Sequence, residues 1–249
     1  MSGIYYAIGG ANYAIKESLE IDLDILNEAR KINYIGHKRN DTPNVLYVGA
    51  ALDDDKKQIN LFKSYYTELG FNVNLLYSYK KNITKEEIEL FFNENDVIYF
   101  GGGMTSKLIN FVKKYDLKEL IINSFNNNKI IAGVSAGAIM LFSYGFGDRE
   151  SFVDNFISVN HKMTEGINIF STTFCPHYQN SSGIFYHDEV KKYNVNGFAV
   201  ENGASLKIKN NNFTVIKSKK SNAFMFDKTN NYKLIHLKND IVYDINLLR

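Results

Sequence analysis

The sequence predicts an α/β fold in which a mostly parallel central sheet carries antiparallel strands toward the C-terminus. Over the first two-thirds of the chain, short apolar runs alternate with amphipathic runs, the pattern of parallel strands connected by helices. From Asn196 onward, short strand-like runs follow one another, separated by clusters of Asn, Gly and Lys. The 249 residues are 45% hydrophobic and contain no evident linker or repeat, so we expect one domain over residues 1–249.

The expected strands are runs rich in β-branched and aromatic residues, which favour extended backbone. In the first two-thirds these are Ile4–Ile8, Val45–Val48, Val73–Tyr77, Val97–Phe100 and Ile130–Ala132. A further strand is expected within Ile167–Phe170 and Thr172–Phe174. The runs expected to form antiparallel strands at a sheet edge are Phe198–Val200, Ser205–Ile208, Phe213–Ile216 and Lys233–Leu237.

The expected helices fill the intervals between the first strands. Apolar residues recur at helical spacing in residues 21–29 and 57–69, and Gly70 is suited to end the second of these helices. Thr84 with Glu87 forms a capping-box pattern for a helix that continues through Phe91. Further helices are expected over residues 105–113, 138–142 and 183–192.

Composition excludes several classes of function. The formal net charge is only +2, from 29 basic and 27 acidic residues, so we do not expect a nucleic-acid partner. Cys175 is the only cysteine, which excludes an internal disulfide. The N-terminal run lacks the features of a signal peptide, and no apolar stretch approaches the length of a membrane span, so we expect a cytoplasmic protein without a membrane partner.

The strongest local motif is Gly133-Val134-Ser135-Ala136-Gly137, which directly follows an expected strand and precedes a helix-forming run. A serine at such a sharp strand-to-helix turn holds its hydroxyl clear of the backbone, where it can act as a nucleophile. A turn that only serves packing is the alternative, because the five-residue pattern is weak by itself. The structural context favours Ser135 as a catalytic nucleophile.

A second glycine-rich turn, Gly101-Gly102-Gly103, follows the expected strand Val97–Phe100. The carboxyl ends of parallel strands lie at one edge of a sheet, so this turn and the serine turn should lie near each other. We expect the N–H groups of Gly103 and Ala136 to form an oxyanion hole. A phosphate-binding loop is the alternative, but the Lys-Ser/Thr pair of a P-loop does not follow the glycines.

A serine nucleophile needs a base, and His177 is the best candidate among the five histidines. It lies in Phe174-Cys175-Pro176-His177-Tyr178, at the end of an apolar run that could deliver it to the same sheet edge. The other four histidines have polar or charged neighbours and are expected at the surface. Cys175 as nucleophile is a weaker alternative, because adjacent side chains on a strand point to opposite faces.

The histidine in turn needs an orienting carboxylate, and the residues leave two candidates open. Glu201 ends an expected strand just before a turn, which is an unusual place for an unpaired carboxylate. Asp148 lies in what reads as a polar loop, where simple solvation would explain it. We favour Glu201, with Asp148 as the alternative third member.

The order of these motifs along nearly the whole chain resembles peptidase family S51, the aspartyl dipeptidase and cyanophycinase-like serine peptidases. The resemblance also includes Gly9-Gly10, Asp53-Asp54-Asp55 after an Ala-rich turn, and Glu201-Asn202-Gly203-Ala204. The Ala-Ile after Ser-Ala-Gly and the Cys-Pro-His-Tyr segment are most similar to an uncharacterised branch of Gram-positive type. The resemblance implies a three-layer sandwich, flavodoxin-like or like class I glutamine amidotransferases.

The resemblance further implies a serine peptidase of omega or dipeptidase type, in which Ser135 attacks a small peptide through an acyl-enzyme. His177 would be general acid and base, Glu201 would orient it, and no metal or organic cofactor is expected. Two departures weaken the expectation of an acidic N-terminal residue in the substrate: Met104 replaces an Asn, and no arginine lies between Tyr178 and Asn196. The alternatives are an esterase-type serine hydrolase and a non-catalytic binding relative, and a homodimer is left open.

Overall fold

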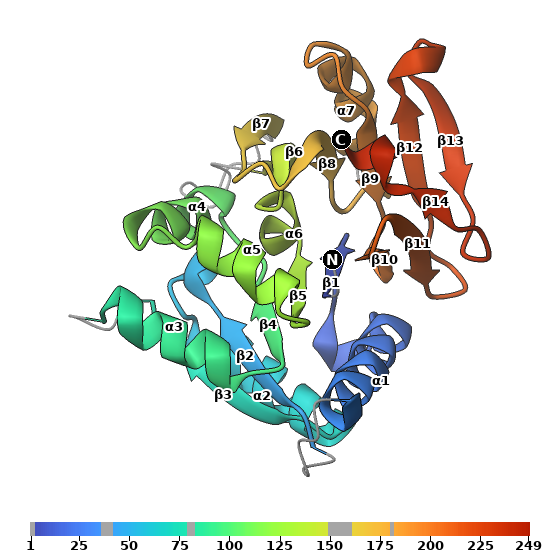
Figure 1. The fold of residues 1–249 in the computed structure, drawn as a ribbon. Coiled ribbons are helices and arrows are strands. Elements are labelled where there is room, and N and C mark those ends of the chain that lie inside the picture. The colour runs from blue at the N-terminus through green and yellow to red at the C-terminus, as the bar shows by residue number, and fades with distance from the viewer. Residues whose placement is uncertain (1–2, 36–41, 79–82, 149–160, 180–181) are drawn as a thin grey trace.

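The structure is a computed structural model that describes residues 3–35, 42–78, 83–148, 161–179 and 182–249. An eight-stranded mixed sheet forms its centre, in the order β14-β11-β10-β1-β5-β4-β2-β3. The first five strands of the chain run parallel to one another, and β10, β11 and β14 extend the sheet antiparallel beyond β1 (Figure 1). The strands are β1 (Ile4–Ile8), β2 (Asn44–Val48), β3 (Asn72–Leu76), β4 (Val97–Phe100), β5 (Ile130–Val134), β10 (Ala204–Lys209), β11 (Asn212–Lys217) and β14 (Tyr243–Asp244). The predicted α/β class with a mostly parallel central sheet is confirmed.

Helices cover both faces of this sheet because the side chains of its central strands alternate between two apolar clusters. On one face, Ile4, Tyr6 and Ile8 of β1 pack with α1 (Leu19–Ile35) and α2 (Lys56–Leu69). On the other face, Tyr5 and Ala7 pack with α3 (Lys85–Glu94), α4 (Thr105–Lys114), α5 (Lys118–Asn126) and α6 (Ala136–Ile139). Both faces of β1, β2, β4 and β5 are therefore buried, as expected for inner parallel strands, whereas the edge strand β3 is exposed at Asn72 and Asn74.

A second sheet of six strands, in the order β13-β12-β9-β8-β6-β7, was not predicted. Its strands are β6 (Phe142–Asp148), β7 (His161–Glu165), β8 (Phe170–Cys175), β9 (Gly197–Val200), β12 (Ala223–Asp227) and β13 (Lys233–Leu237). The helix α7 (Ser182–Lys191) packs against β6, β7 and β8 of this sheet. Figure 1 shows this sheet and α7 in the upper part of the view, away from α1 and α2.

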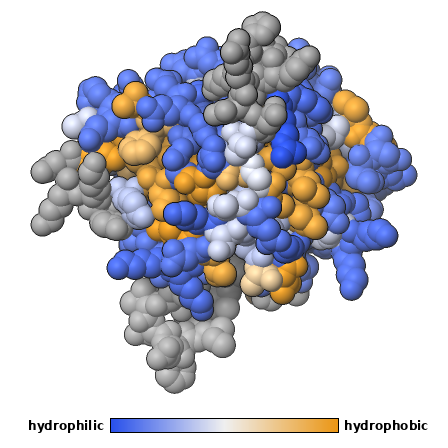
Figure 2. Space-filling view, turned by 90° about the horizontal axis from the view of Figure 1, so that it is seen from below, coloured by the Kyte–Doolittle hydropathy of each residue, from blue (hydrophilic) through white to orange (hydrophobic). Residues whose placement is uncertain are grey.

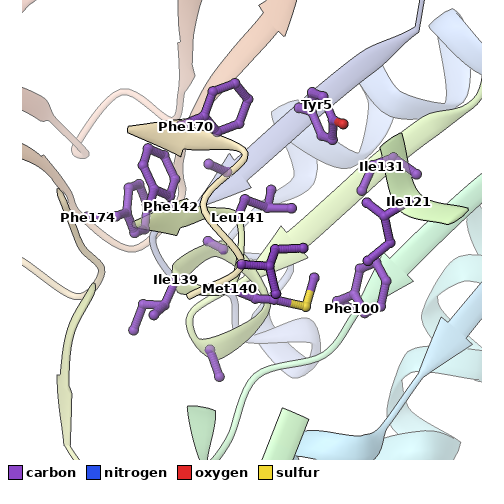
Figure 3. Packing of buried hydrophobic residues seen from close by; sticks show 14 of the residues in the cluster. Tyr5, Phe100, Ile121, Ile131, Ile139, Met140, Leu141, Phe142, Phe170 and Phe174 are labelled. Atoms are coloured by element: carbon purple, nitrogen blue, oxygen red, sulfur yellow. The ribbon is translucent and has the colours of Figure 1, made fainter. Parts of the chain in front are cut away.

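The two sheets share one apolar core. Phe142, Phe170 and Phe174 of the second sheet belong to the same buried cluster as Tyr5 and Ile131 of the first. Figure 3 shows these side chains around the short turn of α6, with Ile139, Met140 and Leu141 at its centre. The segment that follows Ser135 is therefore anchored by packing on both sides.

Several expected elements differ in the structure. The expected helix over residues 138–142 is only α6, which ends at Ile139, and Phe142 begins β6 instead. The chain leaves the helix because the carbonyl oxygen of Met140 accepts from the Ile167 N–H at 2.8 Å, and that of Leu141 accepts from the Ile169 N–H at 2.9 Å. These long-range bonds override local helix propensity.

Strand partners also differ from those expected. The run Phe198–Val200 lies inside the second sheet, parallel to β8 and antiparallel to β12, rather than at an antiparallel edge. Within the run 167–170, only Phe170 is part of a strand. The expected boundaries of the first-sheet strands agree with the structure to within two residues.

The surface carries both apolar and hydrophilic residues. Figure 2 shows one face from below, where apolar areas in the middle are interrupted by paler and hydrophilic residues. No helix in the described ranges combines the length and apolarity that crossing a bilayer requires. The large hydrophobic side chains most exposed in the described chain are Ile15, Val242, Leu90 and Phe185.

Candidate active site

Ser135 lies in the sharp turn between β5 and α6, as the motif predicted. Its backbone has φ 52° and ψ −111°, a strained conformation for a residue other than glycine. Its N–H donates to the carbonyl oxygen of Ile8 at 3.0 Å, which ties the turn to the end of β1. A Cβ on Gly137 would overlap the carbonyl oxygen of Phe100, so the turn tolerates no side chain there. The strain and the close packing together expose the hydroxyl of Ser135 at the carboxyl edge of the sheet.

His177 is brought to the same edge by the end of β8. The Nε2 atom of His177 lies 2.9 Å from Ser135 Oγ, which is hydrogen-bonding distance for a nucleophile and its base. The backbone of His177 has φ 53°, and its N–H donates to the carbonyl oxygen of Gly9 at 3.1 Å. The end of β1 therefore holds both the serine turn and the histidine turn.

Asn202 is the hydrogen-bond partner of the other imidazole nitrogen. Its Oδ1 lies 2.6 Å from His177 Nδ1. Because an amide oxygen can only accept, this contact places a proton on Nδ1 and leaves Nε2 as the acceptor that a base needs. The Asn202 N–H donates to Gln179 Oε1 at 3.0 Å, which links the Asn202 turn to the segment after the histidine.

Glu201, the predicted orienting carboxylate, is hydrogen-bonded elsewhere. Its Oε2 accepts from the backbone N–H of Asn222 at 2.8 Å and from the Asn222 side-chain amide at 3.1 Å. The Oδ1 of Asn222 lies 3.1 Å from His236 Nε2. Glu201 thus ties its own turn to the segment before β12, while the next residue, Asn202, takes the position at the imidazole that we expected for Glu201.

Asp148, the alternative third member, ends β6 opposite His161 of β7 rather than lying in a polar loop. Its side chain lies outside the described residues. His37 also lies outside them, whereas His236 is exposed as expected.

Gly10 was quoted only as part of a motif, yet it lies directly beneath the histidine. A Cβ at this position would overlap Asn202 Oδ1 and would lie 2.7 Å from His177 Nδ1. Its carbonyl oxygen also accepts from the Gly203 N–H at 2.9 Å. A glycine is therefore required for the close approach of β1 to the His177–Asn202 pair. In the sequence, the Gly9-Gly10 pair at the end of the first expected strand was the feature that could have indicated this close approach.

Three backbone N–H groups are candidates for an oxyanion hole. Among the described residues, the N–H groups of Gly102, Gly103 and Ala136 have no backbone acceptor. Gly102 faces the nucleophile, since a Cβ on it would lie 3.3 Å from Ser135 Cβ. Gly103 has φ 134°, and a Cβ on it would overlap Ala51 and Leu52, so this position requires glycine. The predicted donors are joined by Gly102, which sequence reasoning did not single out.

The three consecutive aspartates beside the glycine turn have structural partners. Asp53 forms an ion pair with Lys107. Asp54 accepts from the Ser78 N–H at 2.6 Å and from the Ser78 hydroxyl at 2.7 Å. Asp55 caps α2 by accepting from the Gln58 N–H at 2.9 Å. These contacts hold the segment after β2 against the glycine turn, where Met104 N–H donates to Ala51 O at 2.8 Å.

Tyr178 follows His177 in the sequence. The pKa of its hydroxyl is raised, mainly by burial and further by the nearby Cys175 and Glu201. Tyr178 is therefore neutral at physiological pH.

Within the described ranges, no three His, Cys, Asp or Glu side chains are grouped in a way that could hold a metal ion.

Comparison with known proteins identifies the family. A model of peptidase family S51 matches residues 25–216. The chain is 26% identical over 221 residues to the uncharacterized peptidase YgaJ of Bacillus subtilis (strain 168), covering 87% of this chain and 88% of YgaJ.

Two solved structures share the fold. The crystal structure of a peptidase from an acI-B1 Actinobacterium aligns with a TM-score of 0.70 at 15% identity, over 98% of this chain and 97% of that one. The structure of a putative peptidase E from Listeria monocytogenes EGD-e aligns with a TM-score of 0.58 at 16% identity, over 87% of this chain and 99% of that one. With the family model matching most of its length, this chain belongs to peptidase family S51.

Proposed function

We propose that the protein is a serine-type peptidase that cleaves the amide bond of small peptides through an acyl-enzyme on Ser135. The observation that carries the proposal is the chain of contacts from Ser135 Oγ to His177 Nε2 at 2.9 Å and from His177 Nδ1 to Asn202 Oδ1 at 2.6 Å. It joins a nucleophile, a base and an orienting group in the order that the chemistry requires.

In the first half of the reaction, the proton of the Ser135 hydroxyl moves to His177 Nε2 while Oγ bonds to the substrate carbonyl carbon. The negative charge that develops on the carbonyl oxygen is stabilised by the N–H groups of Ala136 and of Gly102 or Gly103. When the tetrahedral species collapses, the C–N bond breaks and His177 gives its proton to the leaving amine. The product of this half is an ester between Ser135 and the acyl part of the peptide.

In the second half, His177 takes a proton from water as the water oxygen bonds to the ester carbon. Collapse of this second tetrahedral species returns the proton to Ser135 Oγ and releases the carboxylic acid. Asn202 keeps the imidazole in the required tautomer in both halves. As a neutral amide, Asn202 orients the imidazole without adding the negative charge that a carboxylate would bring to the imidazolium.

The substrate class we propose is a dipeptide or similarly short peptide. The family membership supports peptidase activity. A panel of Asp-X, Glu-X and neutral dipeptides, with isoaspartyl and polyaspartate substrates, tests whether an acidic N-terminal residue is preferred. Met104 beside the glycine turn, where an amide side chain would serve polar recognition, leads us to expect neutral dipeptides among the substrates.

The test is a comparison of Ser135→Ala with Ser64→Ala, an exposed serine on α2. We expect Ser135→Ala to abolish labelling by a fluorophosphonate probe and hydrolysis of every dipeptide, and Ser64→Ala to retain both. Full labelling of folded Ser135→Ala would refute the assignment. Labelling without hydrolysis of any amide, but with turnover of aryl esters, would favour an esterase instead.

A further inference from the structure

A cavity of about 410 Å³ lies over one face of the first sheet, near the start of β1, whereas Ser135 lies beyond the end of that strand. It opens between α5, the start of β1 and the turn before β8, with η4 (Ile245–Leu248) on its remaining side. Tyr5 lines it from the second position of β1, whereas the serine turn is bound to Ile8, the last residue of that strand. Three residues of a strand separate these points by about 10 Å, so the cavity is distinct from the catalytic residues.

The walls of the cavity are aromatic and aliphatic. The ring of Tyr5 stacks on Phe125 with centroids 4.1 Å apart and meets Phe170 edge-on at 5.3 Å. Ile208 of β10 and Ile245 of η4 are buried and complete the apolar lining. Figure 3 shows Tyr5 and Phe170 at one margin of the shared core. The volume and the apolar lining suit a small organic molecule.

The hydroxyl of Tyr5 lies among these apolar side chains, and Asn126 and Asn168 also line the cavity. The residue is only 3% exposed. Its hydroxyl forms no hydrogen bond with another described residue, and its oxygen is not among the fully buried polar atoms that lack a partner, so it remains accessible from the cavity. Burial raises the pKa of Tyr5 strongly, so the group stays a neutral hydrogen-bond donor. It offers a proton to an acceptor that would lie in the cavity.

The charged residues at the cavity favour an anionic acceptor. Lys118 is half-buried and Arg249 is exposed, and both line the cavity together with one exposed acid, Glu119. No ion pair in the described chain involves Lys118 or Arg249. An incoming carboxylate could therefore pair with Lys118 without displacing an existing partner.

We propose that this cavity binds a small carboxylate with a flat apolar body, such as an arylalkanoate. Its carboxylate accepts from the Tyr5 hydroxyl and pairs with the Lys118 ammonium group. Its apolar part lies against Phe125, Phe170 and Ile245. The site does not depend on the catalytic assignment of Ser135.

The probe for the test is 3-(4-fluorophenyl)propionate, with binding followed by ¹⁹F NMR titration of the wild-type protein. The corresponding neutral amide and the corresponding propylamine share the aromatic body and test the charge. We expect saturable binding of the carboxylate, at least tenfold weaker binding of the amide, and none of the amine. Absence of saturable carboxylate binding up to about 10 mM, or equal binding of the amide, would overturn the proposal.

Variants locate the binding. Tyr5→Phe keeps the stacked ring and removes the hydroxyl, so we expect carboxylate affinity to fall about tenfold. Ile122→Trp, which places an indole at the lining of the cavity, should abolish binding. The matched control is Tyr232→Phe, because the Tyr232 hydroxyl is fully buried without a hydrogen-bond partner and lies outside this cavity.

The control should bind like the wild type, and melting temperatures establish that each variant is folded. If folded Tyr5→Phe and Ile122→Trp both bind the carboxylate like the wild type, the ligand lies elsewhere and the proposal fails.

Discussion

Replacing Gly10 by alanine tests whether the close approach of β1 holds the His177–Asn202 pair in position. The added Cβ would lie 2.7 Å from His177 Nδ1 and would overlap the Asn202 amide oxygen, whereas ordinary contact begins at 3.4 Å. The imidazole must therefore retreat by about 0.7 Å, or the hydrogen bond between the two side chains must break. A misplacement on the order of 1 Å can lower a rate about 100-fold.

We therefore expect Gly10→Ala to slow fluorophosphonate labelling of Ser135 by about 100-fold while the protein remains folded. The labelling rate needs no knowledge of the natural substrate, and circular dichroism with thermal melting monitors the fold. The matched control is Gly147→Ala, whose Cβ would lie 3.1 Å from the flexible end of Ile139, so the neighbour can adjust. This control should label within about threefold of the wild type.

The double variant Gly10→Ala/Asn202→Ala separates a local clash from general damage. Asn202→Ala removes the amide with which the new methyl group overlaps most and leaves only the approach to His177 Nδ1, so adding Gly10→Ala should then cost less than it does in the wild type. Such non-additivity is the mark of two residues in contact. A Gly10→Ala protein that is folded and labels at the wild-type rate would refute our account of this turn.

Two further predictions concern carboxylates. Glu201→Gln keeps an oxygen that can accept from Asn222, so its rate of fluorophosphonate labelling should stay within about threefold of the wild-type rate. Glu201→Ala removes that oxygen and should lower the labelling rate about tenfold. Equal labelling rates in the two variants would show that Glu201 does not position the Asn202 turn. Burial raises the pKa of Asp22 from 3.8 to about 6, despite hydrogen bonds from Tyr66, Ser18 and Tyr65. Because the folded protein holds this proton more tightly than the unfolded chain, Asp22 lowers the free energy of unfolding as the pH rises from about 4 to 6, by about 3 kcal/mol in all. Urea unfolding should show that the stability of Asp22→Asn, relative to the wild type, increases over this range and is constant above it; a constant difference from pH 4 to 6 would contradict the assignment.

The order of strands and helices in the first two-thirds could be predicted because local patterns determine it. The run Ile4–Ile8 and the capping box at Thr84 carry their own signals, and both appear in the structure as expected. The second sheet could not be predicted in this way. Its strand β6 begins where a helix was expected, because the partners of Met140 and Leu141 lie more than 20 residues away.

The nucleophile turn and the histidine were foreseeable for different reasons. Ser135 lies in a turn that its own neighbours define, whereas His177 was chosen because it ends an apolar run and the other four histidines have polar or charged neighbours. The partner of His177 was harder to predict. Glu201 and Asn202 are consecutive, and only the tertiary contacts of the chain decide that Asn222 faces the first and the imidazole faces the second. A preference for carboxylates in this role directed the prediction to Glu201.

The position of β10 beside β1 has a consequence for the order of events during synthesis. The Ser205 hydroxyl donates to the carbonyl oxygen of Ala7, 198 residues earlier in the chain, and the Asn202 turn immediately precedes this strand. Closing so long a loop is slow and is possible only after most of the chain has left the ribosome. A nascent chain that already contains Ser135 and His177 would therefore still lack the amide that orients the imidazole, so hydrolytic competence would arise only at the last stage of folding.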